Sequence, residues 1–128
     1  MNKKNYRTHK ALLKLLLEAG ADINKKNDKG YSELAIAIAN SQKNLAKFLM
    51  DLGADKNSID YNGLSIFYRA ALAENYEMVR LLIKKGANPD IRDRRGFTAL
   101  HISVESGFYK MVKILLKSRA NLNTKNFE

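Results

Sequence analysis

The segment EAGADIN at residues 18–24 returns as DLGADKN at residues 51–57 and as KKGANPD at residues 84–90. A fourth version, SRANLN at residues 118–123, has lost the glycine. The glycines of the first three segments are 33 residues apart, and a second series keeps the same spacing: Gly30, Gly63 and Gly96. Two independent series with one period indicate a chain built from structural repeats.

Apolar pairs recur with the same period and indicate helices. In each repeat two such pairs stand three residues apart, as Met78-Val79 and Leu81-Leu82 do in the third. This i, i+3, i+4 spacing places the pairs on one face of a helix. A shorter apolar helix is expected before each full helix, at residues 34–39, 67–73 and 100–104.

Polar residues and glycines mark the ends of these helices. A hydroxyl residue that can accept a hydrogen bond from free backbone N–H groups precedes each short helix: Ser32, Ser65 and Thr98. Glu33 then falls in the first turn, where the helix dipole favours a negative charge. The repeated segments at residues 18–24, 51–57 and 84–90 are here called the GAD-type segments, and the glycine of each suits the left-handed residue that stops a helix. The series of Gly30, Gly63 and Gly96 suits a turn in the segment that connects two repeats.

These segments resemble the ankyrin repeat family, whose pattern runs D-x-x-G-x-T-P-L-H, then two helices, then G-A-D-x-N. Residues 93–101, DRRGFTALH, match it best, and the resemblance extends over residues 10–125. It implies an all-α ankyrin-repeat solenoid of about 3.5–4 helix–turn–helix repeats joined by β-hairpin-like fingers, forming a single domain over residues 1–128. The expected repeats are residues 1–26 (partial), 27–59, 60–92 and 93–125.

The sequence departs from the family pattern at several positions. The family's proline before the leucine is replaced by Glu33, Ile66 and Ala99. Only His101 keeps the histidine that ties neighbouring loops in the family, so the junctions with Ala35 and Tyr68 are expected to lack that hydrogen bond. Arg119 replaces the helix-ending glycine, and a side chain in the left-handed conformation costs about 1–2 kcal/mol. On that basis Arg119→Gly is expected to stabilise the protein.

The two ends of the stack should carry polar side chains, because terminal repeats have no neighbour on one side. Lys10 and Lys14 are expected to give this cover at the N-terminal helix. At the other end the expected cover comes from Lys110, Lys113 and Lys117. Self-association through an exposed end stays open.

Composition and charge narrow the kinds of partner. The chain has 128 residues, 45% of them apolar, and a formal charge of +10 from 23 Lys and Arg against 13 Asp and Glu. The excess favours anionic partners of several kinds: nucleic acid, anionic lipid and acidic protein surfaces. The sequence contains no run of about 18 apolar residues, so it predicts no membrane span. The absence of cysteine fits a reducing compartment, so a cytoplasmic location is expected; delivery into a host cell has no signal in the sequence to support it.

No pattern of residues predicts catalysis. The chain has two histidines, and His101 is interpreted as structural and His9 as a surface residue. Neither a nucleophile motif nor a phosphate-binding loop is present. Asp55, Asp60, Asp90 and Asp93 recur with the repeat, so turn chemistry explains them better than an acid/base pair. The chain is expected not to be an enzyme and to use no cofactor or metal.

The resemblance places partner binding on the concave side, at the finger tips and on the exposed face of the first helices. The residues at those positions vary between repeats, as a surface fitted to one partner would, and Tyr and Arg are common interface anchors. The predicted partner-binding residues are Lys29, Tyr31, Asn40, Tyr61, Asn62, Leu64, Leu72, Arg92, Arg94, Arg95, Phe97 and Glu105.

A protein-interaction module, an adaptor or scaffold, is therefore the leading interpretation, with an acidic or mixed surface on its partner. One alternative is charge-driven nucleic-acid binding. It is less favoured, because lysines are spread over helices and loops and are not interleaved with stacking aromatics. The other alternative is a truncated repeat product without a partner of its own.

Overall fold

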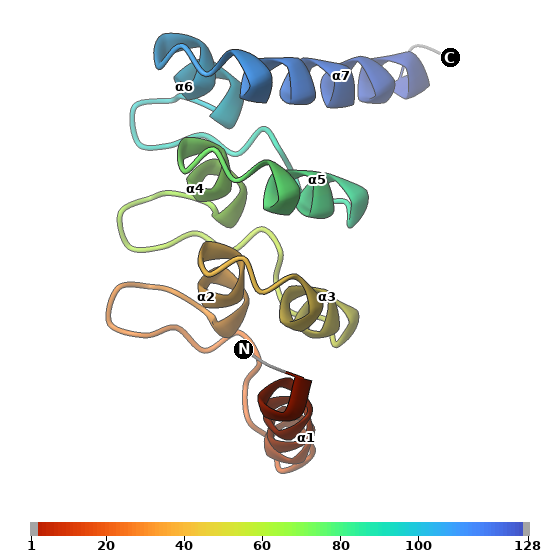
Figure 1. The fold of residues 1–128 in the computed structure, drawn as a ribbon. Coiled ribbons are helices and arrows are strands. Elements are labelled where there is room, and N and C mark those ends of the chain that lie inside the picture. Colours follow the sequence, from red (N-terminus) through yellow and green to blue (C-terminus); the bar gives the residue numbers. More distant parts are fainter. Residues whose placement is uncertain (1–2, 127–128) are drawn as a thin grey trace.

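The helices form two parallel layers. The computed structural model describes residues 3–126, and the side chains of residues 6–119. The described chain contains seven helices: α1 Lys3–Glu18, α2 Glu33–Ala39, α3 Lys43–Asp51, α4 Ile66–Leu72, α5 Tyr76–Lys84, α6 Ala99–Glu105 and α7 Tyr109–Asn126. The inner helices α2, α4 and α6 stack in one layer, the outer helices α1, α3, α5 and α7 stack in the other, and long loops project beyond the inner layer (Figure 1). The predicted all-α repeat fold is confirmed.

The inner helices begin where their caps place them. The side-chain oxygens of Ser32, Ser65 and Thr98 accept hydrogen bonds from the backbone N–H three residues on, at 3.2, 3.0 and 3.3 Å. Each helix starts at the residue after its cap, one position before the start expected from the apolar pattern alone. The cap thus defines the start of a helix more sharply than the first buried residue does.

The GAD-type segments join one repeat to the next. Within each segment Asp22, Asp55 or Asn88 accepts a hydrogen bond at 2.9 Å from the backbone N–H two residues on. The following asparagine reaches the next repeat: Oδ1 of Asn24 accepts from the N–H of Asp55, and Oδ1 of Asn57 from that of Asn88, both at 2.8 Å. These bonds explain why aspartate and asparagine recur with the period.

Three fingers project from the stack, at residues 27–31, 60–64 and 93–97. The leading side chain of each, Asn27, Asp60 or Asp93, accepts from the backbone N–H groups two and four residues on, at 2.8–3.1 Å. Turn chemistry therefore accounts for Asp60 and Asp93, as predicted. Gly30 has φ +85°, and a Cβ there would lie 2.5 Å from the backbone nitrogen of Tyr61, so only glycine lets adjacent fingers approach this closely.

The core lies between the layers and is shared by neighbouring repeats. Leu49, Met78, Leu82 and Met111 are buried on successive outer helices, and Phe67 is buried on α4. Since a single helix pair has no second layer on which to bury its apolar face, the stack is stabilised by contacts between repeats.

The helix α7 continues past Arg119, so the expected left-handed residue at that position is wrong. Its bounds are Tyr109–Asn126, and Arg119 Nη1 donates to Oδ1 of Asp90 at 2.6 Å. Without a glycine at this position nothing favours a left-handed turn, and arginine is a good helix former.

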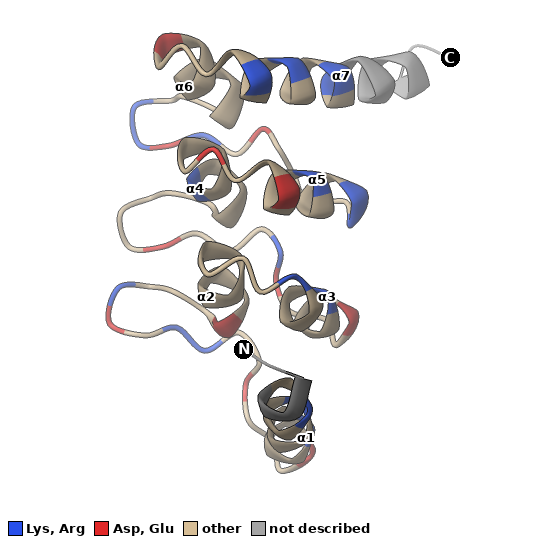
Figure 2. Ribbon diagram, viewed as in Figure 1, with Lys and Arg blue, Asp and Glu red and all other residues tan. Residues whose placement is uncertain are grey.

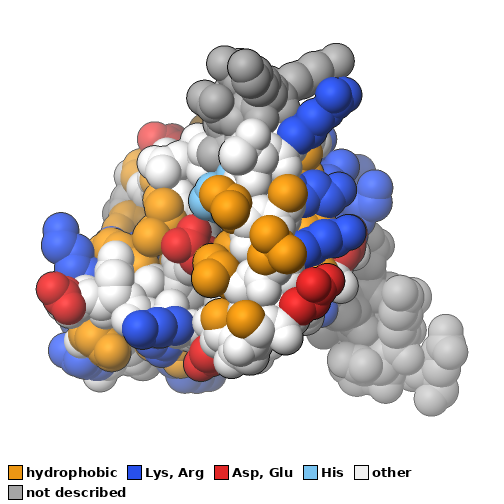
Figure 3. Space-filling model, turned by 90° about the horizontal axis from the view of Figure 1, so that it is seen from below, with side chains coloured by type: hydrophobic (Ala, Val, Ile, Leu, Met, Phe, Trp, Pro, Cys, Tyr) orange, Lys and Arg blue, Asp and Glu red, His pale blue; other side chains and the backbone are white. Residues whose placement is uncertain are grey.

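The N-terminal end is less polar than expected. Lys10 lies over the ring of Phe48 at 4.7 Å, and Tyr6 donates to the carbonyl oxygen of Asn44 at 3.2 Å, so both side chains face α3. The expectation that Lys10 covers the outer face is therefore wrong, because packing on α3 sets the rotation of α1. Apolar side chains lie exposed at this end (Figure 3): Leu12, Leu15 and Leu16, at 54%, 62% and 55% exposure.

The C-terminal end carries both polar and apolar side chains. Lys110 lies over the ring of Tyr76 at 4.6 Å and so faces α5, which corrects its expected role as outer cover. Lys113 and Lys117 are exposed, as expected. Exposed Val104 and Leu116 accompany them.

Candidate partner-binding surface

Two neighbouring hollows lie between the fingers and the inner helices. The larger, here called the central groove, has a volume of about 500 Å³ and lies between α2 and α4, with the first two fingers beside it. Its walls are mainly apolar and include Ile36, Ala39, Leu64, Leu72 and Ala73. The smaller, here called the finger pocket, has a volume of about 280 Å³ and lies between the last two fingers. Leu64 and Leu72 line both, so the two hollows form a continuous surface.

Seven of the twelve predicted partner-binding residues line these hollows. Tyr31 and Asn40 line the central groove, Leu64 and Leu72 line both hollows, and Asn62, Arg94 and Arg95 line the finger pocket. The other five lie outside them: Lys29, Tyr61, Arg92, Phe97 and Glu105.

Three of the predicted contact residues, Lys29, Tyr61 and Arg94, hold the fingers to one another. The N–H of Tyr61 donates to the carbonyl oxygen of Lys29 at 3.2 Å, and Arg94 Nη2 donates to the carbonyl oxygen of Tyr61 at 2.5 Å. The ring of Tyr61 remains 57% exposed. Two backbone groups of Tyr61 and the side chain of Arg94 therefore align adjacent fingers in the free protein.

The arginines of and beside the last finger are largely engaged with groups of the protein itself. Arg92 Nη1 donates to the carbonyl oxygen of Gly96 at 2.9 Å. Arg95 lies over the ring of Phe97 at 4.7 Å and 3.6 Å from a carboxylate oxygen of Asp93. The finger thus presents an ordered basic tip in place of three free guanidinium groups.

Arg69 is a site residue that the sequence reasoning missed. It lies on α4 in the central groove, donates through Nε to Oδ2 of Asp60, and stands over the ring of Tyr31 at 5.4 Å. A signal was present in the sequence, since the positions 33 residues before and after it hold Ile36 and Ile102. A charged residue at a position that is apolar in the neighbouring repeats indicates a role other than packing.

A tyrosine replaces the family's histidine at one junction. The hydroxyl of Tyr68 donates to Oδ2 of Asp93 in the next finger at 2.8 Å, so the expectation that this junction lacks a tie is wrong. Burial and this bond raise the pKa of Tyr68, while the backbone N–H of Phe97 and the same bond hold the pKa of Asp93 below its usual value. His101 instead caps its own helix, because its Nδ1 accepts from the N–H of Thr98 at 3.2 Å.

The second histidine, His9, lies partly inside the protein. His9 is half-buried with no hydrogen-bond partner for its buried Nε2, which corrects its interpretation as a surface residue. No group of three or more His, Cys, Asp or Glu suited to a metal ion lies within the described residues. No helix in this part of the chain has the length and apolar character of a membrane span.

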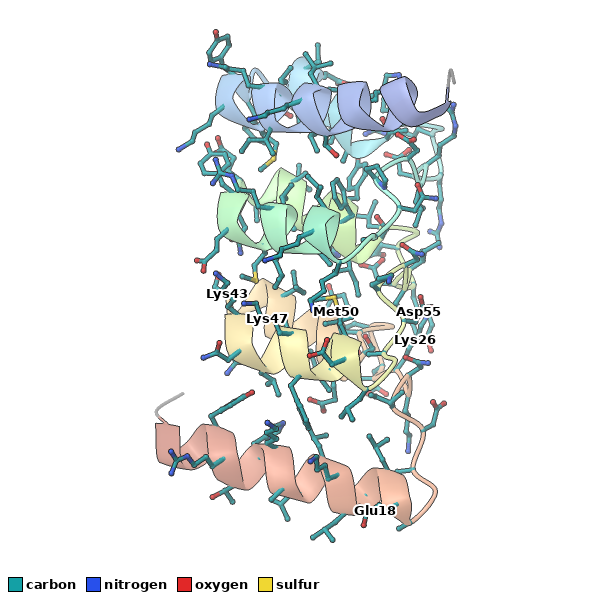
Figure 4. All side chains as sticks on the ribbon, turned by 90° about the vertical axis from the view of Figure 1, so that its right-hand side faces the viewer. Glu18, Lys26, Lys43, Lys47, Met50 and Asp55 are labelled. Atoms are coloured by element: carbon teal, nitrogen blue, oxygen red, sulfur yellow. The ribbon has the colours of Figure 1, made fainter. Side chains whose placement is uncertain are left out.

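Positive charge is spread over the molecule. Lys and Arg occur on the fingers, on the loops and along the outer helices (Figure 2). On the outer layer, where Figure 4 marks Lys43 and Lys47 on α3, part of this charge is paired: Lys43 lies 3.6 Å from Glu77, and Lys85 lies 3.1 Å from Asp51. Over the side chains that the structure describes, at residues 6–119, this distribution does not produce the single basic stripe that tracks a nucleic-acid backbone.

The family model for ankyrin repeats in three copies matches residues 4–93 and again residues 34–126. The chain belongs to the ankyrin repeat family. No curated protein matches it. Ankyrin repeats generally serve as protein–protein interaction modules and typically do not catalyse reactions, so the ankyrin surface described above is considered as a binding surface.

Proposed function

We propose that this ankyrin protein is an adaptor that binds another protein through the central groove and the finger pocket. The observation that carries the proposal is the continuous apolar surface formed where the two hollows share Leu64 and Leu72. Leu72 is 40% exposed on a short helix whose other faces are well packed, so the fold gains little from its outward position. Exposed apolar surface framed by polar groups is typical of binding sites.

The experiment compares two paired variants in capture of partners from a cell lysate. Ala39→Glu/Ala73→Glu places two carboxylates on exposed alanines that line the central groove. The matched control, Ala11→Glu/Ala19→Glu, makes the same change at exposed alanines of and beside α1. We expect proteins bound by the wild type to be kept by the control and lost by the groove variant. Equal capture by both variants would contradict binding in the groove.

Nucleic-acid binding is the main competing function, because the chain carries a formal charge of +10. Binding through charge alone weakens steeply as salt rises. We expect random DNA and RNA to shift in a gel only at low salt. A shift that persists at about 150 mM salt would favour the competing function. Capture of no protein at all would favour a repeat product without its own partner.

Self-association is a second candidate, favoured by the exposed leucines of α1. A third hollow of about 360 Å³ lies beside this helix and next to α2, lined by Leu13, Leu17 and Ile36. The helix α1 is the first of the outer layer within the described residues. In a two-fold dimer the α1 helix of each copy would lie in the hollow of the other, which would bury both apolar surfaces.

Sedimentation velocity over a range of concentrations tests this dimer. We expect the wild type to sediment faster as concentration rises, and Leu15→Lys to sediment as a monomer throughout, because Leu15 is 62% exposed in the single chain. Sedimentation of the wild type as a monomer at every concentration would refute the dimer.

We also propose that the protein acts in the cytoplasm without a catalytic role of its own, which fits its cysteine-free sequence. Cell fractionation with an antibody against the chain tests the location. Recovery in a secreted or membrane fraction would contradict it.

A further inference from the structure

The central groove contains one charged pair in walls that are mainly apolar. Asp60 and Arg69 face each other there, and the side chain of Asp60 is only 4% exposed whereas that of Arg69 is 37% exposed. The pair is therefore buried from the side of the aspartate and open from the side of the arginine. Nothing in the repeat requires it, since isoleucine occupies the Arg69 position in both neighbouring repeats.

The hydrogen bonds of Asp60 are satisfied within its own repeat. Its Oδ1 accepts from the N–H groups of Asn62 and Leu64 at 2.9 and 3.1 Å, and its Oδ2 accepts from Nε of Arg69. The carboxylate consequently fixes the arginine, and the ring of Tyr31 supports the guanidinium from one side at 5.4 Å.

The guanidinium keeps two donor nitrogens for a ligand. Within the part of the chain that the structure describes, Nη1 and Nη2 of Arg69 make no hydrogen bond to the protein. A guanidinium held in place by its Nε can present these two nitrogens to both oxygens of a carboxylate. Because Ile36, Leu64 and Leu72 line the same groove, a carboxylate bound there would have apolar surface beside it.

We infer that the central groove takes a peptide segment of a partner protein in which an Asp or Glu stands next to a large apolar residue. The acidic side chain pairs with Nη1 and Nη2 of Arg69, and the apolar side chain packs against Leu64 and Leu72. The exposed amide of Asn40, also in the groove, suits the peptide backbone. The positive charge of the whole chain, +10, favours the approach of such a segment. This inference rests on the proposed function and specifies its partner.

The test begins with selection of a phage-displayed random peptide library on the full chain. The enriched peptides are then measured for binding to the groove variant, Ala39→Glu/Ala73→Glu, and to the control, Ala11→Glu/Ala19→Glu. We expect enriched peptides to carry an acid beside a large apolar residue and to bind the control but not the groove variant. Enriched peptides that bind Ala39→Glu/Ala73→Glu as well as they bind the wild type would overturn both the inference and the proposed function. Enrichment of groove-dependent peptides without an acid would overturn the inference alone.

A thermodynamic cycle then locates the carboxylate. An enriched peptide and its acid→amide counterpart are titrated into the wild type and into Asp60→Asn/Arg69→Gln, which removes both charges and keeps an acceptor for the turn at residue 60. We expect each change alone to weaken binding at least about ten-fold and the two together to weaken it little further. Fully additive losses would overturn the inference, since the carboxylate would then bind elsewhere.

A second variant separates loss of peptide contact from loss of folding. Arg69→Lys keeps a positive partner for buried Asp60 but removes the planar pair of donors. We expect it to retain the melting temperature of the wild type and to lose most of its preference for the acid over the amide peptide. An unchanged preference in Arg69→Lys would contradict contact at Nη1 and Nη2. Binding of a random oligonucleotide that Arg69→Lys weakens at about 150 mM salt would also overturn the assignment to a peptide.

Discussion

Backbone strain gathers at one register position of the repeats, between the inner and outer helices. Ser41 and Glu74 have φ of 55° and 54° there, and the equivalent residue of the last repeat is Gly107 at 75°. A side chain in this left-handed region is unfavourable, whereas glycine is not. The last repeat has thus the residue that the geometry favours, and the two before it do not.

Replacing Glu74 with glycine should therefore stabilise the protein. Its side chain is exposed and makes one long hydrogen bond, from the hydroxyl of Tyr76 at 3.4 Å. We expect Glu74→Gly to raise the free energy of unfolding by about 1 kcal/mol, measured by urea denaturation. Glu74→Ala is the control, because it removes the same side chain and keeps the strain. Equal effects of the two substitutions would show that the strain is not responsible.

Asp93 should make folding stability sensitive to acid. Its carboxylate accepts from the N–H groups of Arg95 and Phe97 and from the hydroxyl of Tyr68, and these bonds hold its pKa below the ordinary value of 3.8. The folded state then binds fewer protons than the unfolded state near that pH. The contribution is fully present above about pH 3.8 and is lost as pH falls through the lowered pKa.

The change Asp93→Asn tests this dependence. Asparagine keeps an acceptor for the two backbone N–H groups and does not titrate, so we expect the stability of the variant to fall less steeply between about pH 4 and pH 2 than that of the wild type. Melting temperatures across that range provide the measurement. If the melting temperatures of the two proteins fall equally with pH, Asp93 does not contribute to the loss of stability in acid.

Among the helices, α7 reverses an expectation drawn from the family pattern. Since the helix continues to Asn126, Arg119 lies inside it and pairs with Asp90 in the preceding segment. We now expect Arg119→Gly to destabilise the protein by about 1 kcal/mol, because glycine is a poor helix former. Thermal melting of Arg119→Gly and of Arg119→Ala measures the helix contribution and separates it from the ion pair. A higher melting temperature for Arg119→Gly would show that the helix ends near this residue after all.

The sequence predicted the helices well because their apolar spacing, caps and glycines all follow one 33-residue period. Besides the end of α7, it failed where a contact depends on a neighbouring repeat. The tie from Tyr68 to Asp93 and the position of Lys10 over Phe48 join residues that are far apart in the chain. Arg69 could have been found, since it interrupts a periodic apolar position. Its partner in the groove required the fold.

Across the molecule, the repeats divide their apolar residues between two tasks. One set is buried between neighbouring helix pairs and includes Leu82, which is fully buried on α5. The other set, which includes Leu72 on α4, lines the hollows beside the fingers. The two leucines are ten residues apart in sequence and belong to the same repeat. The proposed adaptor function depends on this division, because a residue needed for the core is not free to fit a partner.

Urea denaturation of Leu82→Ala beside Leu72→Ala tests the division most directly. We predict that Leu82→Ala lowers the free energy of unfolding by about 2–5 kcal/mol, because it leaves a cavity between repeats. Leu72→Ala should lower it by no more than about 1 kcal/mol, since that side chain is 40% exposed. Similar losses in the two variants would contradict the account, because the wall of the groove would then be part of the core.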